Sequence, residues 1–555
     1  MTPPLAAERV INLADLFEVV ADAVPERLAI VCGDARSTYA DLDRRANRVA
    51  HALAAVGVTA GDVVGIHARN RIEWIETMIG ALKLRATTIN VNFRYVESEL
   101  AHVYASAGMR ALVVEREYAE VAGAAARDTA SLTAFLVLED GSEGVVPTGF
   151  EDFERALSSV SDVRDFGPRS PDDPFILFTG GTTGLPKGVV WRSEDIFRAA
   201  MEHGGPEARL RDPGQLVERA ANPPLVMGLL APLMHGAAQW SLWISLTTAG
   251  TYVLWHGRTF DGPEIWRLLA RERVQMVGLV GDAMARPLAD VLPEMTDCDL
   301  SALVGIASGG AALSPAVREA LVAAKPGLVI IDGYGASETG YHGTGSGAID
   351  GEAGPAFHVD ADTAVLDDDL RPVSPGSDQI GKVARTGHIP LGYLGDPAKT
   401  AEVFRIDGDG TRWVVPGDLA TVGNDGQIHL LGRGSTVINT GGEKVYPSEV
   451  EAAIKRHPAV LDALVVGVPD ERFGAKVAAV VALRPGTAAT DDELDTATRA
   501  TVAGYKTPRS WVRVPEVRRT PAGKPDYRWA TERARSSATQ QTRTSATGSA
   551  QEVGA

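Results

Sequence analysis

The chain has 555 residues, of which 45% are hydrophobic and 23% are charged, and its formal net charge is −18 at pH 7. This length exceeds what one hydrophobic core supports, so a soluble protein of several layered units is expected. The acidic balance argues against nucleic-acid binding. The two cysteines provide neither a disulfide framework nor zinc spacing, so a reducing cytoplasm is expected, and the N-terminus lacks the pattern of a signal peptide.

The first third of the chain alternates strand and helix patterns. Asn12 can cap a first helix, and Thr38 with Asp41 three residues later can open the next one. Apolar runs and amphipathic stretches then alternate at Val63–His67, Ile72–Lys83, Thr87–Val91, Ala111–Val114 and Ala134–Leu138. This alternation predicts βαβ units and a doubly wound parallel sheet.

A loop rich in glycine and threonine stands between two apolar runs, Phe175–Phe178 and Val189–Trp191. Glycines let backbone N–H groups converge on one anion, hydroxyls add donors, and Lys187 supplies a cation suited to phosphate. Because Pro186 precedes this lysine and strand-like residues follow it, the stretch is not a Walker A loop. We predict a strand–loop–strand phosphate clamp, with an ordinary glycine-rich hairpin as the alternative. Its residues are Thr179, Gly180, Gly181, Thr182, Thr183, Gly184 and Lys187.

The segment from Pro223 to Trp255 contains no acidic residue, lysine or arginine. Pro232, His235 and Gly236 interrupt it, so a buried helix followed by a buried strand is predicted in preference to a membrane span.

Three further apolar runs end in small or polar residues: Val277–Val280, Gly305–Ser308 and Val329–Asp332. Ligands of open α/β sheets gather at the carboxyl ends of such strands, which predicts a nucleotide pocket there. Its candidate residues are Gly309, Gly310, Ala311, Ala312, Asp332, Gly333, Tyr334, Ser337 and Glu338.

The last third changes pattern twice. From Ala361, Asp-Gly and Pro-Gly signals between short strands predict a small antiparallel β unit that ends near Leu431. Past Gly434 a new unit begins, in which Ser448 and Glu451 are predicted to form a capping box at the start of a helix.

The predicted fold class is therefore α/β, with a large N-terminal domain and a mobile C-terminal one. Residues 1–434 would hold two doubly wound sheets and the β unit, and residues 435–532 an α+β domain. Residues 533–555 are low in hydrophobicity and are predicted to be a disordered tail.

Five residues in this framework can serve a nucleotide. Tyr334 can stack on a base, Glu338 can hold Mg²⁺ beside substrate phosphates, and Asp418 can accept hydrogen bonds from a ribose diol. Arg433 stands where the β unit meets the last domain, and Lys524 lies in a loop of glycine and proline. Singly, Tyr334 is as often a core residue and the last three are more often surface charges, but their joint presence in this order indicates nucleotide chemistry.

These motifs resemble the adenylate-forming superfamily of acyl- and aryl-CoA synthetases, from about Leu13 to Trp529. Five stretches are similar to its actinobacterial branch of steroid side-chain and fatty acyl-CoA ligases: Asn90–Tyr95, Lys187–Arg192, Gly281–Pro287, Ile438–Tyr446 and Lys524–Trp529. The chain departs from the family pattern at Ser337, where threonine is usual and the hydroxyl is kept. It departs again at Ser435, a hinge position usually held by aspartate or lysine, which leaves the rate of a hinge rotation open.

The resemblance implies ATP, Mg²⁺ and coenzyme A as cofactor and substrates, and it implies a role for each matched residue. Thr179–Lys187 would cover the ATP β- and γ-phosphates, Gly309–Ala312 and Asp332–Tyr334 would hold adenine, and Ser337 would contact phosphate. Glu338 would be the metal ligand, Asp418 with Arg433 would bind the ribose, and Lys524 would bridge the acid and the α-phosphate. His235 would border the acyl pocket, and the backbone of Gly441, Gly442 and Glu443 would line the tunnel for pantetheine.

The implied reaction joins an apolar carboxylic acid, a steroid side-chain acid or a medium- or long-chain fatty acid, to coenzyme A through an acyl-adenylate. Asp282 is the only carboxylate of the implied acyl pocket that could pair with an amino acid's ammonium group. Two alternatives remain: a fatty acyl-AMP ligase that serves a carrier protein, and a non-catalytic nucleotide-binding protein. The sequence leaves the identity of the acid and a homodimer open.

Overall fold

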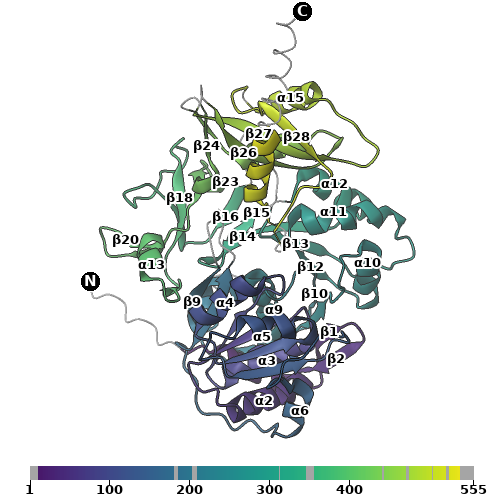
Figure 1. Cartoon of the computed structure of the whole chain (residues 1–555), viewed down its shortest axis with the longest axis vertical. Helices are drawn as coiled ribbons and strands as arrows, with labels where there is room; N and C mark the ends of the chain where they lie inside the picture. The colour runs from purple at the N-terminus through teal and green to yellow at the C-terminus, as the bar shows by residue number, and fades with distance from the viewer. Residues whose placement is uncertain are drawn as a thin grey trace, which may run out of the picture.

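A computed structural model describes residues 10–179, 186–202, 209–311, 313–345, 356–440, 443–470, 474–502, 504–520 and 524–537. Among these residues a large N-terminal part and a small C-terminal part are distinct, the latter lying at the top of Figure 1. The chain begins with α1 (Leu13–Ala23), which Asn12 caps by accepting a hydrogen bond from the Ala14 N–H, as predicted.

The first parallel sheet has the strand order β4-β3-β5-β6-β7. Its strands are β3 (Val63–His67), β4 (Thr87–Asn90), β5 (Ala111–Glu115), β6 (Ala134–Leu138) and β7 (Glu151–Asp152). The helices that precede, connect and follow these strands are α2 (Tyr39–Ala55), α3 (Ile72–Lys83), α4 (Glu97–Ala107), α5 (Arg116–Ala125) and α6 (Phe153–Ser158). Alternate residues of β3 and β5 face opposite sides, because Val64 and Ile66 pack in one hydrophobic core and Val63 in another. The sheet is therefore doubly wound, as predicted.

The larger sheet has fifteen strands in the described residues and changes from parallel to antiparallel at β14. Its parallel strands are β1 (Leu28–Cys32), β11 (Thr251–Leu254), β10 (Val226–Leu229), β12 (Met276–Leu279), β13 (Gly305–Gly309) and β14 (Val329–Ala336), with β2 (Ala35–Thr38) at one edge. The accompanying helices are α8 (Gln215–Ala220), α9 (Gly236–Thr247), α10 (Gly262–Arg271), α11 (Gly281–Val291) and α12 (Pro315–Ala324). The three strands predicted to bear the nucleotide pocket, β12, β13 and β14, are parallel neighbours.

The predicted β unit consists of antiparallel strands, as expected. It is continuous with the large sheet through β15 (Gly340–Gly345), β16 (Ala356–Val359), β23 (Ile428–Arg433) and β22 (Asp418–Val422). Beyond them lie β18 (Gly381–Arg385), β17 (Thr363–Leu366), β21 (Arg412–Val414) and β20 (Phe404–Ile406). The large sheet and the β unit are joined because β14 continues past the carboxyl end of β13 and pairs with β15 there.

A third sheet holds the base of the predicted phosphate clamp. It consists of β8 (Pro174–Thr179), β9 (Lys187–Arg192) and β19 (Gly392–Tyr393), in the order β19-β9-β8. Strands β8 and β9 are antiparallel and pair Thr179 with Lys187, so the lysine begins a strand as predicted. The short helices α7 (Ser193–Ile196) and α13 (Pro397–Val403) follow β9 and β19.

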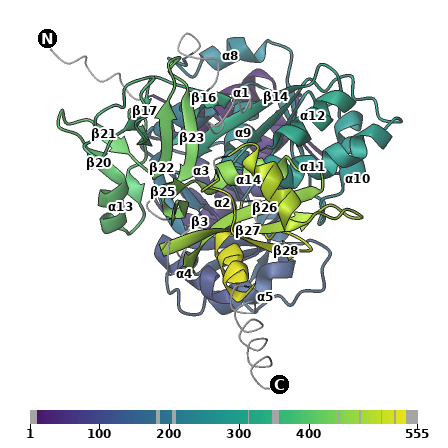
Figure 2. The ribbon, with the colours of Figure 1, turned by 90° about the horizontal axis from the view of Figure 1, so that it is seen from above.

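The C-terminal part is a three-stranded sheet flanked by helices (Figures 1 and 2). Its elements are the hairpin β24 (Ile438–Thr440) and β25 (Glu443–Val445), α14 (Pro447–Lys455), β26 (Val460–Asp470), β27 (Gly474–Leu483), α15 (Asp491–Arg499) and β28 (Ser510–Val514). Residues 527–537 are helical, so this helix extends past the predicted boundary at residue 532.

The predicted capping box of Ser448 and Glu451 is wrong. In such a box Ser448 would precede the helix and Glu451 would be its third residue. The helix begins at Pro447 instead, so its third residue is Glu449, which accepts a hydrogen bond from the Tyr446 N–H. Glu451 is buried and accepts a hydrogen bond from the Val465 N–H. The predicted buried helix and strand between Pro223 and Trp255 are confirmed as α9 and β11. None of the helices in the described ranges is both long and apolar enough for a transmembrane span.

Candidate active site

The base of the phosphate clamp is anchored by a buried amide. Asn90, at the end of β4, donates to the carbonyl oxygens of Phe178 (2.8 Å) and Met234 (2.6 Å) and accepts from the Phe178 N–H. It thereby ties the clamp to the residue before His235. The loop itself, with Gly180, Gly181, Thr182, Thr183 and Gly184, lies outside the described residues.

Lys187 and Glu338 are brought together by one turn of the chain. The Lys187 ammonium donates to Asp396 at 2.6 Å and lies 5.8 Å from the centroid of the Tyr393 ring. The Tyr393 hydroxyl donates to Glu338 Oε1 at 2.9 Å. Sequence reasoning missed Tyr393 and Asp396, because nothing in their local pattern shows that the chain returns to β9 there.

The site fits Mg²⁺ only with help from a substrate. No group of three or more His, Cys, Asp or Glu side chains in the described ranges could hold a metal ion. Mg²⁺ is commonly bound by one or two carboxylates together with substrate phosphates, and Glu338 beside Lys187 offers such a carboxylate.

The predicted adenine and ribose residues meet at the end of β14. The Tyr334 hydroxyl donates to Asp418 at 3.0 Å, and its ring stacks on His342 with centroids 4.8 Å apart. Asp418 is paired across the sheet with Arg433, whose side chain is not described. The carboxylate of Asp332, which belongs to the same predicted set, forms an ion pair with Arg318, and burial raises the pKa of that carboxyl group.

The glycines between β13 and β14 leave room beside the strand ends. A Cβ atom on Gly309 would stand 3.4 Å from the Gly333 carbonyl oxygen, and Gly310 has a φ of +77°, which favours glycine. Ala311 follows in the described chain, whereas Ala312 lies outside it. The backbone oxygen of Ser337 accepts from the Trp191 indole N–H at 2.9 Å, so β9 supports this loop as well.

His235 and Lys524 come from opposite parts of the chain and interact electrostatically. His235 precedes α9, and its Nε2 is buried with no hydrogen-bond partner among the described residues. Burial, followed by the positive charges of Lys524 and Arg94, lowers the pKa of His235 from 6.5 to about 4. The ring is therefore neutral at pH 7, and Lys524 is exposed on the C-terminal part.

The carboxylate of Asp282, in the predicted acyl pocket, already accepts two hydrogen bonds. Its Oδ1 accepts from the Ser314 N–H at 2.7 Å and its Oδ2 from Arg286 at 3.3 Å. Asp282 thus supports the start of α12, which disfavours a role in binding an amino acid's ammonium group.

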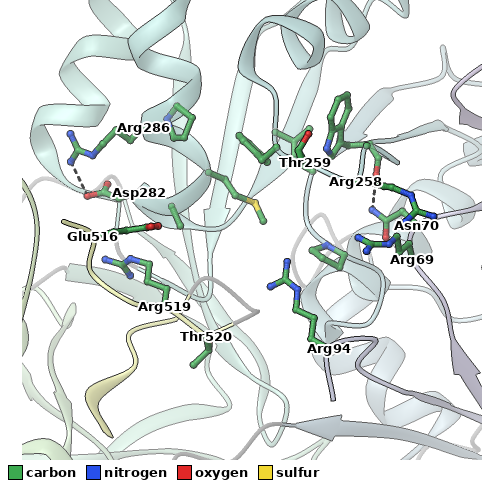
Figure 3. Close-up of a pocket in the computed structure, with 18 of the residues that line it drawn as sticks. Arg69, Asn70, Arg94, Arg258, Thr259, Asp282, Arg286, Glu516, Arg519 and Thr520 are labelled. Carbon is green, nitrogen blue, oxygen red and sulfur yellow. Dashed lines mark hydrogen bonds and ion pairs between the residues drawn. The ribbon is translucent and has the colours of Figure 1, made fainter. Parts of the chain in front are cut away.

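A cavity of about 570 Å³ lies between the two parts of the molecule (Figure 3). Arg69 and Arg94 approach it from the first parallel sheet, while Arg519 and Thr520 approach it from the C-terminal part. Arg519 is held by Asp462 through contacts of 2.6 to 2.9 Å, whereas burial and the adjacent Arg69 lower the pKa of Arg94. Guanidinium groups such as these are suited to bind phosphate, although the cavity lining also holds the carboxylates of Asp282, Asp462 and Glu516.

The predicted pantetheine residues are only partly described. Gly441 and Gly442 lie outside the described residues, and Glu443 begins β25 with its side chain undescribed.

Two family models together match most of the chain. Residues 17–394 match the family model "AMP-binding enzyme", and residues 449–524 match "AMP-binding enzyme C-terminal domain". The chain is 48% identical over 531 residues to a medium/long-chain-fatty-acid–CoA/3-oxocholest-4-en-26-oate–CoA ligase of Mycobacterium tuberculosis (strain CDC 1551 / Oshkosh), covering 94% of this chain and 96% of the relative. It is 48% identical over 534 residues to a 3-oxocholest-4-en-26-oate–CoA ligase of Rhodococcus rhodochrous, covering 94% of this chain and 95% of that protein.

A solved structure shares the fold across nearly the whole chain. The anthranilate CoA ligase AuaEII in complex with anthranoyl-AMP superposes with a TM-score of 0.81 at 22% identity, covering 96% of this chain and all of that one. This likeness confirms the predicted α/β class with a large N-terminal and a small C-terminal domain.

Proposed function

The chain belongs to the AMP-binding enzyme family, and from that premise we propose that it is an AMP-forming acyl-CoA ligase for bulky apolar carboxylic acids. The acid is a steroid side-chain acid or a medium- or long-chain fatty acid, the substrates named for the two relatives. The observation that carries the proposal is the contact of Tyr393 with both Lys187 and Glu338, because it holds a cation and a carboxylate suited to a nucleotide triphosphate in one place.

The first step is adenylation. The acid's carboxylate attacks the α-phosphorus of ATP, the bond to the β-phosphate breaks, and pyrophosphate leaves. Two anions repel each other, so the transition state needs concentrated positive charge, which Lys187 and Lys524 supply from two sides. Glu338 would hold Mg²⁺, which neutralises phosphate charge when bound. Tyr334 and Asp418 would hold the adenosine.

The second step is thioester formation. The thiol of coenzyme A attacks the acyl carbonyl carbon, and AMP leaves. Lys524 must withdraw for this step, so we propose a rotation of the C-terminal domain, residues 435–532, about Ser435. Gly434 beside it begins a 3₁₀ turn, and glycine there accommodates a change of backbone dihedrals.

The pocket walls favour an apolar acid. Leu230, Leu233, Met234 and Trp240 are buried on the loop and helix beside His235. Asp282, the one carboxylate predicted in this part of the pocket, forms an ion pair with Arg286. This pairing disfavours binding of the ammonium group of an amino acid.

A screen of carboxylic acids tests the proposal. Steroid side-chain acids and medium- and long-chain fatty acids are incubated with ATP, Mg²⁺ and coenzyme A, and AMP and thioester are measured. We expect both products in equal amounts for at least one class. Acyl-adenylate that accumulates despite coenzyme A would indicate the fatty acyl-AMP ligase, and absence of acid-dependent pyrophosphate exchange would indicate a non-catalytic protein.

Arg94 gives a sharper prediction for the second step. We propose that the arginines of the interdomain cavity receive the phosphates of coenzyme A. Arg94→Ala is then expected to raise KM for coenzyme A about tenfold, the effect of one charge-assisted hydrogen bond, with adenylation nearly unchanged.

The control is Arg155→Ala, because the Arg155 side chain is 69% exposed on α6 and pairs weakly with Glu151 at 3.8 Å. Pyrophosphate exchange and steady-state thioester formation separate the two steps. A rise in KM for ATP or acid instead would show that Arg94 serves adenylation.

A further inference from the structure

One turn of the chain contacts both predicted charges of the triphosphate site. Strand β19 pairs antiparallel with β9, and α13 begins at Pro397, four residues after β19 ends at Tyr393. Helix α13 lies on the left of Figure 1, next to β20. From this turn Tyr393 donates a hydrogen bond to Glu338, and Asp396 accepts one from Lys187. One turn therefore contacts two segments that are far apart in sequence.

The turn itself is held firmly. Thr400 Oγ1 accepts from the Tyr393 N–H at 2.9 Å and donates to the Asp396 carbonyl oxygen at 2.8 Å. Asp396 Oδ1 caps α13 by accepting from the Lys399 N–H, which leaves Oδ2 for Lys187. A Cβ atom on Gly392 would stand 2.4 Å from Thr400 Cγ2, so this packing requires glycine.

Each contact restrains a group that would otherwise rotate freely. A lysine ammonium is a point charge on a flexible stem, and a carboxylate has two equivalent oxygens. The Tyr393 hydroxyl donates to Oε1 of Glu338 and so fixes the orientation of that carboxylate. The Tyr393 ring and Asp396 restrict the position of the Lys187 ammonium. The hydrogen bond from Lys187 holds the pKa of Asp396 below its usual value, so this carboxylate stays ionised at neutral pH.

We propose that Tyr393 and Asp396 are positioning residues of the triphosphate site, with Tyr393 orienting Glu338 toward the metal–phosphate complex and Asp396 holding Lys187 in place for the γ-phosphate end. The inference rests on the proposed adenylation. Because the Lys187 and Asp396 side chains are 40% and 34% exposed, their ion pair is weak, and an incoming triphosphate can take over the lysine.

Equilibrium binding of ATP tests the part played by Tyr393 without any acid or turnover. The dissociation constant is measured with and without Mg²⁺ for the full chain and for Tyr393→Phe, which keeps the ring near Lys187. We expect the metal-free constant to stay within about twofold and the tightening due to Mg²⁺ to fall about tenfold, since one hydrogen bond to a charged group is lost.

The same change in a Glu338→Gln background should have no further effect on the Mg²⁺ dependence, because the two residues act as one unit. An equal loss in both backgrounds, or a loss of metal-free affinity in Tyr393→Phe, would overturn the role of Tyr393. A chain that binds ATP but exchanges no pyrophosphate with any acid would refute the ligase function while this binding result stands by itself.

Asp396→Asn tests the second contact, because asparagine keeps the cap of α13 and removes the charge. We expect kcat for acid-dependent pyrophosphate exchange to fall by up to about fivefold, as for the loss of one partly exposed ion pair, while KM for ATP does not rise. The control is Asp425→Asn, an exposed turn residue that accepts from the Gln427 N–H. A rise in KM parallel to the fall in kcat, or no change in kcat, would overturn the role of Asp396.

Discussion

Replacement of Lys524 by alanine is expected to slow acid-dependent pyrophosphate exchange about 10²–10³-fold, the range found when one donor to a developing charge is removed. Thioester formation from a supplied acyl-adenylate should remain near the level of the unsubstituted chain, because in the proposed mechanism Lys524 leaves the site before coenzyme A reacts. The two half-reactions are measured separately, by exchange of labelled pyrophosphate and by thioester formation without ATP.

The support of Lys524 makes this prediction specific. The Thr520 N–H donates to the Lys524 carbonyl oxygen at 2.7 Å, and the neighbouring Arg519 is held by Asp462. The backbone at Lys524 is therefore held in place, and removal of the ammonium group alters the charge with little effect on packing. Lys382→Ala, at an exposed pair with Asp368, serves as the control. Equal loss in both half-reactions would contradict the proposed role.

Replacement of Lys83 by methionine is expected to have the largest effect on stability. The Lys83 side chain is 0% exposed, and its ammonium donates to Glu18, Asp43 and Asn47 at 2.6 to 2.7 Å. Without it, two largely buried carboxylates lose a shared cation. Removing one partner of a buried ion pair destabilises by about 3–5 kcal/mol, and the lower end applies here. Arg164 remains next to Asp43, and Arg169 next to Glu18.

The measurement is urea unfolding followed by tryptophan fluorescence, in which a midpoint shift at constant slope reports stability. Lys399→Met is the matched control, because Lys399 forms a partly exposed pair with Glu402 on α13. It should change stability by about 0–1 kcal/mol. Equal midpoints for the two variants would show that the buried cluster contributes no more than a surface pair.

Local patterns predicted much of the fold. Apolar runs placed most strands of both parallel sheets but not β7 or β10, and the position of Pro186 before Lys187 distinguished a strand from the helix of a Walker A loop. These predictions held because the residues concerned bury their side chains in any arrangement of the sheets. The Ser448 and Glu451 capping box failed because Glu451 finds a better partner, the Val465 N–H, within a core that the local pattern does not show.

The sequence by itself determined which chemical groups are available: a glycine- and threonine-rich loop with Lys187, a carboxylate at Glu338, and a second lysine at Lys524. Only the tertiary structure decided how these groups are supported. Lys187 meets Asp396 across 209 residues and Glu338 meets Tyr393 across 55, and such contacts depend on how sheets pack. Local propensity acts over a few residues, whereas the direction of a charged side chain is set by the partner that folding brings beside it.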